Sequence, residues 1–259
     1  MNSHPALSVT ERGSGVPTLV FLHYYGGSAA EWASVADRLS PRFRCLLPDL
    51  RGFGASAASD VPDTWSVEDA ADDVSALLAD RVPASFVLVG HSMGGKIALA
   101  LAARRPAGLR GLVLVAPSPP TPEPIPDALR ARLLSTHGSR EAAIEGAKAI
   151  TVQPPGSAPF ERVVADSLRT APGAWRAWLV TGSREDISPA MGRVTVPVLA
   201  VSGDKDETIP TAVVRREVVE RVPGAKLAVV AGARHLLPLD RPAELAELIA
   251  GWAGGAGAP

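Results

Sequence analysis

The stretch LVGHSMGGKIALA, residues 88–100, joins a short apolar run to a helical pattern through a serine flanked by glycines. Residues 90–94 have the form Gly-X-Ser-X-Gly, which needs a sharp strand-to-helix turn that lifts the serine hydroxyl clear of the sheet. The first N–H groups of the following helix then lie near that hydroxyl and attract negative charge. A turn of small residues that only packs closely is the alternative. Because the motif follows an apolar run and opens a helix, the context favours Ser92 as a nucleophile.

Six short apolar runs, the one before Ser92 included, are continuous rather than alternating, which is typical of strands buried on both faces of a parallel sheet. They lie at residues 17–23, 43–49, 85–90, 109–117, 196–204 and 225–235. Helical patterns separate them at residues 28–40, 66–80, 92–106 and 241–255. This alternation predicts an α/β fold, a mostly parallel central sheet flanked by helices. Residues 7–15 predict a short antiparallel hairpin at the edge of that sheet.

Two of the helical patterns carry start signals. Ser28 is followed three residues later by Glu31, which predicts a capping box. Ser66 is followed by Glu68 and Asp69, and acids in a first turn are stabilised by the helix dipole. Both serines are therefore expected to begin helices.

The alternation breaks once, between residues 118 and 193. This segment begins with prolines at positions 119, 120, 122, 124 and 126, and helical patterns fill the rest of it. We expect a helical insertion between two sheet strands, and "the insertion" below means residues 118–193. Residues 1–117 and 194–259 are then expected to form the core domain.

The composition excludes several classes of protein. The 259 residues include 26 basic and 27 acidic ones without a basic block, so no nucleic-acid partner is expected. Cys45 is the only cysteine, which excludes an intramolecular disulfide and a thiolate metal cluster within one chain. No apolar run approaches the roughly 18 residues of a membrane span, and the N-terminus lacks the features of a signal peptide. A soluble cytoplasmic protein is expected, with its oligomeric state left open.

A serine hydroxyl needs a base before it can attack, and histidine is the usual one. The chain has five histidines. Four are poorly suited. His4 lies near the start of the chain, and His23 lies at a strand end among glycines. His91 is directly beside Ser92, and His137 lies in the insertion. His235 follows the last strand, at the same carboxyl edge as Ser92, where open α/β sheets bind ligands. We therefore predict His235 as the base.

The base needs an acid that holds its tautomer. The run SGDKDETIP follows the fifth long strand and offers Asp204, Asp206 and Glu207. An acid from this run gives the chain order serine, acid, histidine, which is the order found in hydrolases of this architecture.

Five segments together resemble the α/β-hydrolase superfamily, in its serine esterase and cofactor-free haloperoxidase-like branch. They are HYYGGS (23–28), DLRGFGAS (49–56), GHSMGG (90–95), GDKDETIP (203–210) and GARHLLPLDRP (232–242), in the family's order and spread over nearly the whole chain. The resemblance implies that the acid is Asp206, the second aspartate of Gly-Asp-X-Asp, while Asp204 braces its loop. Some members place the acid after the strand that precedes the insertion, where Glu123 is the nearest candidate in this sequence.

The resemblance also implies an oxyanion hole of two main-chain N–H groups. One belongs to Met93, directly after the nucleophile. The other comes from the loop after the first long strand, where the matching position is Tyr25. Many relatives have glycine where this chain has Tyr24, so this loop departs from the family pattern. In the same resemblance, Asp49 and Arg51 brace the loops around the nucleophile.

In the family such an insertion is a cap over the active site. Trp175 and Trp178 lie three residues apart, on one helical face, and are expected to line an apolar substrate pocket; anchoring of the insertion to the core is the alternative. Tyr24 is a further substrate-binding candidate. Met93, Leu236 and Leu237 are expected to add apolar walls.

A serine nucleophile indicates the chemistry. Related haloalkane dehalogenases and epoxide hydrolases carry an aspartate where Ser92 stands, because a carboxylate forms their alkyl-ester intermediate. A serine suits acyl transfer through an acyl-enzyme. We therefore predict hydrolysis of a carboxylic ester or lactone of a small, largely apolar substrate. No metal and no organic cofactor is expected, because ligand clusters, GxGxxG and P-loop motifs are missing from the sequence.

Three other functions remain open at this point. Haloperoxidase-like perhydrolysis and carbon–carbon bond hydrolysis use the same three residues, and fold analogy does not separate them from ester hydrolysis. The scaffold also supports ligand-binding proteins without catalysis, although such a protein has no need of a complete serine, histidine and acid set.

Overall fold

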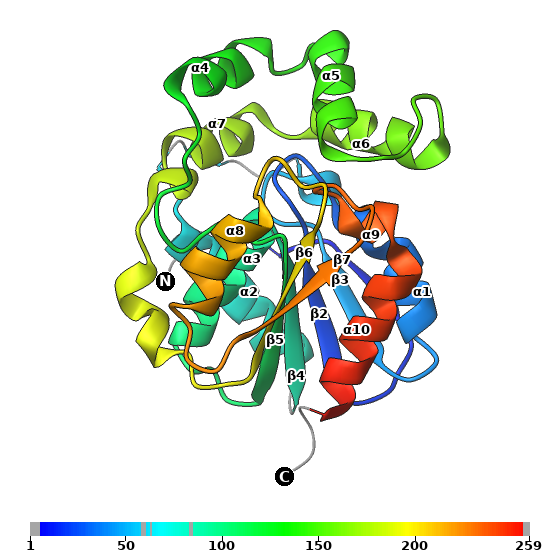
Figure 1. Ribbon diagram of the computed structural model, residues 1–259, viewed down its shortest axis with the longest axis vertical. Coiled ribbons are helices and arrows are strands. Elements are labelled where there is room, and N and C mark those ends of the chain that lie inside the picture. Colours follow the sequence, from blue (N-terminus) through cyan, green and yellow to red (C-terminus); the bar gives the residue numbers. More distant parts are fainter. Residues whose placement is uncertain (1–5, 58–60, 63, 83–84, 256–259) are drawn as a thin grey trace.

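A seven-stranded sheet of order β1-β3-β2-β4-β5-β6-β7 runs through the molecule in the computed structural model (Figure 1), which describes residues 6–57, 61–62, 64–82 and 85–255. The strands are β1 (Val9–Arg12), β2 (Thr18–Leu22), β3 (Arg44–Pro48), β4 (Phe86–His91), β5 (Leu109–Val115), β6 (Val198–Gly203) and β7 (Lys226–Val230). All neighbouring pairs are parallel except β1 with β3. The α/β fold with a mostly parallel sheet is thus confirmed.

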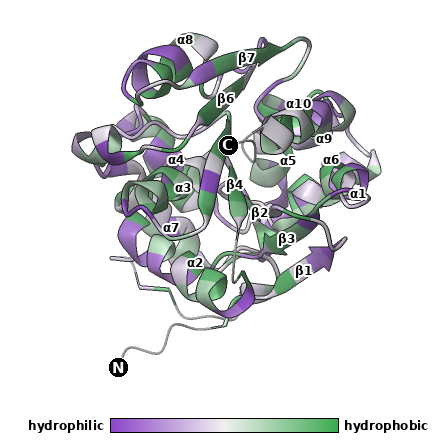
Figure 2. Ribbon diagram, turned by 90° about the horizontal axis from the view of Figure 1, so that it is seen from below, coloured by the Kyte–Doolittle hydropathy of each residue, from purple (hydrophilic) through white to green (hydrophobic). Residues whose placement is uncertain are grey.

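The edge strand β1 corrects one detail. It is antiparallel, as expected, but it pairs with β3 rather than with the next strand in sequence, so the predicted hairpin does not form. Figure 2 shows the reason in the hydropathy of the strands: the central strands are hydrophobic, while the end of β1 is hydrophilic. A strand with exposed polar residues is stable only at an edge, and β1 takes the edge at β3 rather than the one at β7.

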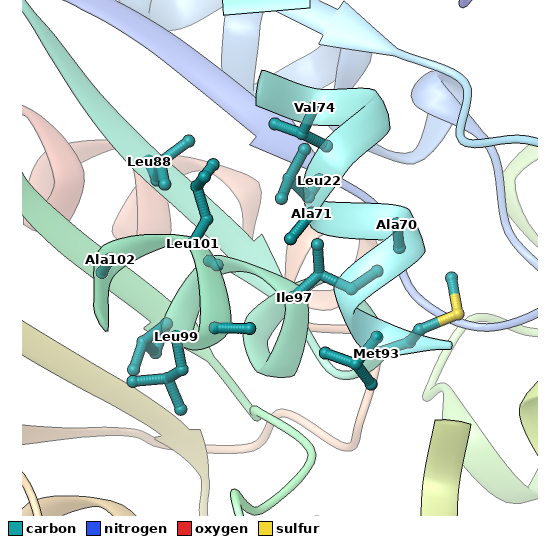
Figure 3. Packing of buried hydrophobic residues seen from close by; sticks show 14 of the residues in the cluster. Leu22, Ala70, Ala71, Val74, Leu88, Met93, Ile97, Leu99, Leu101 and Ala102 are labelled. Carbon is teal, nitrogen blue, oxygen red and sulfur yellow. The ribbon is translucent and has the colours of Figure 1, made fainter. Parts of the chain in front are cut away.

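Both faces of the central strands are buried, because successive side chains of each strand enter opposite layers of the core. In β2, Leu19 and Phe21 pack in one hydrophobic cluster, and Val20 and Leu22 pack in the other. Helices α2 (Val67–Arg81), α3 (Met93–Ala103) and α8 (Thr211–Val214) supply the second of these clusters, part of which is drawn in Figure 3. Helices α1 (Ala33–Leu39) and α10 (Pro242–Gly255) cover the opposite face.

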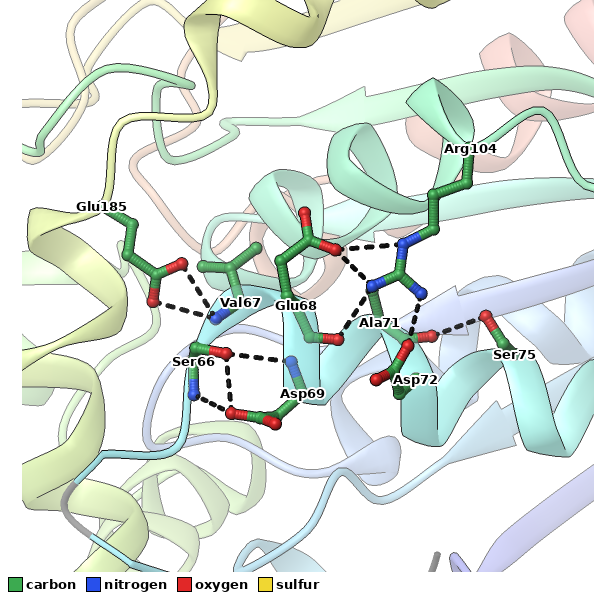
Figure 4. A network of polar contacts seen from close by, with 9 residues as sticks. All are labelled: Ser66, Val67, Glu68, Asp69, Ala71, Asp72, Ser75, Arg104 and Glu185. Atoms are coloured by element: carbon green, nitrogen blue, oxygen red, sulfur yellow. Dashed lines mark hydrogen bonds and ion pairs between the residues drawn. The ribbon is translucent and has the colours of Figure 1, made fainter. Parts of the chain in front are cut away.

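The start of α2 agrees with its signal, and the start of α1 does not. Ser66 caps α2 in a reciprocal capping box with Asp69, part of the polar network in Figure 4. Ser28 instead opens a 3-10 turn, Ala29–Trp32, that precedes α1. Its Oγ accepts from the N–H of Ala30, and the carboxyl of Glu31 turns into the core, so the predicted capping box is wrong.

The insertion carries four helices over one end of the sheet (Figure 1): α4 (Asp127–Thr136), α5 (Arg140–Ile150), α6 (Ala158–Arg169) and α7 (Pro172–Val180). It leaves the sheet after β5 and returns to it at β6. Two 3-10 turns, Gly182–Arg184 and Ser188–Arg193, make the return, and Met191 of the second packs in the same core cluster as α3. In the part of the chain described, no helix is both long and apolar enough to cross a membrane.

Candidate active site

Ser92 lies at the turn between β4 and α3, in a backbone conformation (φ 50°, ψ −115°) that few non-glycine residues adopt. The flanking glycines make this turn possible. A Cβ at Gly90 would lie 2.4 Å from the main-chain oxygen of Gly94, and a Cβ at Gly94 would lie 2.4 Å from that of Leu22. Any side chain at either position therefore pushes the helix away from the sheet.

Ser92, His235 and Asp206 form one continuous chain of hydrogen bonds, although they are far apart in the sequence. The Nε2 atom of His235 lies 3.0 Å from Ser92 Oγ, and its Nδ1 lies 2.9 Å from Asp206 Oδ2. A carboxylate only accepts, so Nδ1 carries the proton and Nε2 is free to accept from the serine hydroxyl. The three residues are 4–8 % exposed. The arrangement is that of a serine nucleophile, its base and an orienting acid.

The pKa values of Asp206 and His235 are both shifted by their surroundings in this site. Burial raises the pKa of Asp206, but His235 and the N–H groups of Thr208 and Ile209 outweigh it, so the pKa is lowered and the acid is ionised. Those N–H groups donate to Asp206 Oδ1 at 2.8 and 3.0 Å. Burial alone lowers the pKa of His235, but the charge of Asp206 and its hydrogen bond raise it above the ordinary value.

The competing acids take other places. Asp204 is exposed, and its carboxylate accepts from the N–H of Gly232 at 2.6 Å, which ties its loop to the loop before His235. Glu207 is exposed. Glu123 lies at the pocket described below, where it accepts a 2.7 Å hydrogen bond from Ser118 Oγ. Among these candidates only Asp206 contacts the ring of His235.

The other histidines are occupied elsewhere. His23 is buried, accepts from the N–H of Leu50 through Nε2 and so donates through Nδ1 to the oxygen of Tyr24. His137 lines the pocket described below and packs edge-on against Trp175, with ring centroids 4.7 Å apart. His91 contacts Glu31 and the main chain of His235. His4 lies outside the described residues.

The two N–H groups expected to form an oxyanion hole belong to residues close to Ser92. Met93 is the first residue of α3, and the first N–H groups of a helix have no partner within it. Tyr25 lies in the loop after β2 and lines the same pocket as Ser92. Tyr24, the departure from the family pattern, turns its ring into the insertion, where it packs with Phe160 and Val164.

A cavity of about 300 Å³ lies between the sheet end and the insertion, lined by Ser92 and His235 and by residues of α4, α5, α6 and α7. Tyr24, Tyr25, Trp175 and Trp178 supply its aromatic surface. The Tyr25 ring lies 4.5 Å from that of Trp175 and 6.3 Å from that of Trp178. Trp178 also packs in the core cluster, so it both lines the pocket and anchors the insertion.

Three predicted wall residues lie elsewhere. Leu236 is fully buried among Tyr24, Phe160 and Val164, and its N–H donates to the oxygen of Ile150 in α5. Leu237 packs on the far face of the sheet, and Met93 packs between α3 and α2 (Figure 3). All three are absent from the lining of the cavity. The residue after His235 turns away from the pocket, so its apolar side chain holds the insertion rather than a substrate.

Two buried titratable side chains near this site were not predicted from the sequence. Lys96 is 0 % exposed and donates to the main-chain oxygens of Thr121 and Glu185 at 3.2 and 2.6 Å. Its signal was available, because it is the one charged residue in the apolar helix α3. Glu31 had no such signal, since its partner His91 lies 60 positions along the chain. In the described ranges, no group of three histidine, cysteine or acidic residues could hold a metal ion.

Known proteins are similar to this chain in sequence and in fold. The model of the alpha/beta hydrolase family matches residues 19–248. The 2-(acetamidomethylene)succinate hydrolase of Mesorhizobium japonicum is 32% identical over 88% of this chain and 84% of its own. The pimeloyl-[acyl-carrier protein] methyl ester esterase of Nitrosomonas europaea is 28% identical over 79% of this chain and 83% of its own. The solved enol-lactonase of Burkholderia xenovorans superimposes with a TM-score of 0.85 at 22% identity, covering 96% of both chains.

Proposed function

The chain belongs to the alpha/beta hydrolase family, and from that premise we propose that it is a serine hydrolase of carboxylic esters or lactones. One observation carries the proposal: the hydrogen bonds from Asp206 through His235 to Ser92 end at an apolar cavity of about 300 Å³. A cavity of this size and lining suits a small, largely apolar acyl or ring group. Relatives with esterase and hydrolase names support the same reaction class.

The reaction proceeds in two halves. Ser92 Oγ attacks the substrate carbonyl carbon while His235 Nε2 takes the hydroxyl proton. The carbonyl oxygen becomes an oxyanion held by the N–H groups of Tyr25 and Met93. The tetrahedral species then collapses, the carbon–oxygen bond to the alcohol breaks, and His235 returns the proton to the leaving alcohol. Water repeats the sequence on the acyl-enzyme, which releases the acid and restores Ser92.

Two other reactions use the same residues and differ in the co-substrate or in the bond that breaks. In perhydrolysis, hydrogen peroxide replaces water in the second half and the product is a peracid. In carbon–carbon bond hydrolysis, a carbanion rather than an alkoxide leaves. Esters are favoured here because most of the cavity lining is apolar, with Glu123, Arg132 and Glu145 as its charged side chains, which suits a neutral substrate. A ligand-binding protein without catalysis is the alternative of a different class.

The test is hydrolysis of p-nitrophenyl esters from acetate to decanoate, and of γ- and δ-lactones, by the wild type and by Ser92→Ala. Removing the nucleophile of an intact triad costs on the order of 10⁶ in kcat, so turnover should fall to background. Ser167→Ala removes another serine of the same cavity and should keep activity. Equal turnover in the wild type and in Ser92→Ala would sink the proposal. Labelling of Ser92 by a fluorophosphonate without any ester turnover would point to a narrower substrate or to the peroxide reaction.

A further inference from the structure

Two buried titratable side chains behind the base take no part in the proposed reaction. Glu31 lies in the turn before α1, and His91 is the last residue of β4, directly before the nucleophile. Glu31 is 2 % exposed and His91 is 0 % exposed. The Nδ1 atom of His91 lies 3.2 Å from both carboxyl oxygens of Glu31, and its Nε2 lies 2.9 Å from the main-chain oxygen of His235.

The direction of these hydrogen bonds follows from proton counting. A main-chain oxygen only accepts, so Nε2 of His91 carries a proton. If His91 is neutral, Nδ1 is an acceptor and Glu31 is the protonated donor; if His91 is an imidazolium, Glu31 is a carboxylate. Both arrangements leave the pair without net charge, which suits a site closed to water.

Burial favours the first arrangement. It raises the pKa of Glu31 well above its usual range, and it lowers the pKa of His91 well below its usual range. Glu31 therefore donates to His91, and His91 donates to the main-chain oxygen of His235. These hydrogen bonds therefore all run in one direction, from Glu31 through His91 to the main chain of His235, and neither side chain carries a charge.

We infer that Glu31 and His91 are positioning residues that hold the main chain of His235 in place, so that its ring stays within reach of both Ser92 and Asp206. The inference rests on the proposed function. The ring of His91 also lies 5.1 Å from the ring of His235, centroid to centroid, and 5.4 Å from that of Tyr24. The main chain of Tyr24 interacts with the Glu31 carboxyl. One buried acid thus links the loop of Tyr25, the nucleophile turn and the loop of the base.

Two further observations favour positioning over substrate binding or mere packing. Neither Glu31 nor His91 is among the residues that line the cavity, so a change at either should act on kcat rather than on KM. Buried polar pairs are also costly compared with apolar side chains of similar volume. A pair at this depth, bonded to the main chain of the base on one side and to that of Tyr24 on the other, is explained by the alignment that it provides.

Three variants test the inference, each measured for kcat, KM, the rate of fluorophosphonate labelling, and Tm. Glu31→Gln keeps the length of the side chain, and its amide donates to Nδ1 of His91 as the protonated acid does. Glu31→Asp keeps the acid but withdraws it by one carbon–carbon bond. Val35→Ala removes buried apolar volume from α1, about one turn after Glu31. It changes no hydrogen-bonding group of the pair and serves as the stability control.

We expect Glu31→Gln to keep kcat within about threefold of the wild type. Glu31→Asp should lose about tenfold or more in kcat and in labelling rate, with KM within about threefold, because small displacements of catalytic groups are costly in rate. Val35→Ala should lower Tm and leave kcat unchanged. This ranking of kcat is specific to the positioning role, because Glu31→Gln, which removes the carboxyl group, keeps more activity than Glu31→Asp, which retains it.

Three results would overturn the inference: Glu31→Asp equal to or better than Glu31→Gln, a loss confined to KM, or a matching loss of kcat in Val35→Ala. Ser92→Ala separates this inference from the proposed function. Wild-type turnover in Ser92→Ala removes the proposed function. An inactive Ser92→Ala beside a fully active Glu31→Asp removes only the positioning role.

Discussion

The indole Nε1 of Trp175 donates a 2.9 Å hydrogen bond to the main-chain oxygen of Leu133, which joins α7 to α4 across the insertion. The other side of the same residue faces the pocket. Its ring stacks on that of Tyr25, whose hydroxyl donates to the main-chain oxygen of Trp175 at 3.0 Å. The side chain of Trp175 therefore both lines the cavity and joins two helices of the insertion.

Trp175→Ala should move the ester preference to longer acyl chains, because it removes the largest aromatic surface between Tyr25 and α4. It should also lower Tm, since the partly buried oxygen of Leu133 loses its donor, and a lost hydrogen bond costs about 1 kcal/mol. The chain-length profile of kcat/KM and thermal unfolding measure the two effects. Trp252→Phe is the control, because the Nε1 of Trp252 has no partner to lose. An unchanged profile in Trp175→Ala would remove Trp175 from the substrate pocket.

Asp206→Asn should lower kcat by about 10⁴-fold, as loss of the orienting acid does in other serine hydrolases. Burial lowers the pKa of His235, and Asp206 is what raises it above the ordinary value. The base works only when neutral, so activity falls below its pKa on the acid side. Without Asp206, that acid limb of the residual activity should move to lower pH. Asp204→Asn alters a carboxyl that bonds to Gly232 and should leave the pH profile of kcat unchanged. A loss of kcat in Asp204→Asn larger than that in Asp206→Asn would make Asp204 the acid.

Glu123→Gln should change the selectivity for charge within the cavity. Burial raises the pKa of Glu123, so its carboxyl is neutral at low pH and repels anionic acyl groups as the pH rises. We expect the ratio of kcat/KM for p-nitrophenyl hydrogen glutarate to that for p-nitrophenyl pentanoate to fall with pH in the wild type. Above about pH 6 the glutarate carboxyl is fully ionised. There the ratio should be flat in the variant, and at alkaline pH roughly three- to tenfold higher than in the wild type, on the order of 1 kcal/mol.

The titration of His235 cancels in this ratio because both esters depend on it. Glu145→Gln is the matched control, since Glu145 also lines the cavity but is exposed and pairs with Lys148. Its effect should be small because solvent screens its charge. A wild-type ratio that does not vary with pH and equals that of Glu123→Gln would exclude an ionised Glu123 beside the substrate.

Lys96→Met should alter how stability depends on pH. Burial lowers the pKa of Lys96 from its usual 10.5 to about 8, against the opposing charges of Glu123, Glu185 and Asp186. Between those two pH values the unfolded chain binds more protons at this position than the folded one. The free energy of unfolding contributed by this residue therefore rises with pH from about 8 to 10.5.

Urea unfolding at several pH values measures this contribution as the difference between the wild type and Lys96→Met. The difference should move in favour of the wild type across that window and stay level below it. Lys226→Met, at an exposed lysine of β7, should run parallel to the wild type throughout. Parallel curves for Lys96→Met as well would mean that Lys96 keeps an ordinary pKa.

Most of the fold was predictable because its signals are local. The apolar runs at residues 17–23, 43–49 and 85–90 became β2, β3 and β4 with shifts of one residue at their ends. A continuous apolar run buries all of its side chains when it forms a strand that is covered on both faces of the sheet. The carboxyl edge of a parallel sheet also brings distant loops together, which is why Ser92 and His235 could be paired from their positions alone.

The errors came from partners that are distant in the sequence. Ser28 and Glu31 have the spacing of a capping box, yet Glu31 bonds to His91 and Ser28 donates to Asp166 of α6 at 2.6 Å. Leu236 follows the base and was expected in the pocket, but helices of the insertion cover it. The partner of β1 depended on which of the two sheet edges its segment reached. No local pattern encodes these choices, because each one is decided by the completed fold.

Lys96 holds the insertion near both of its ends by donating to the main-chain oxygens of Thr121 and Glu185. These two hydrogen bonds do not depend on which side chains stand at those positions. Substitutions between these two points leave these two hydrogen bonds intact, so much of the pocket lining is free to diversify while the nucleophile turn stays unchanged. The same two positions are natural junctions for exchanging this segment with that of another member of the family. In such chimeras, we expect substrate range to follow the donor of the segment, with the catalytic core kept from the recipient.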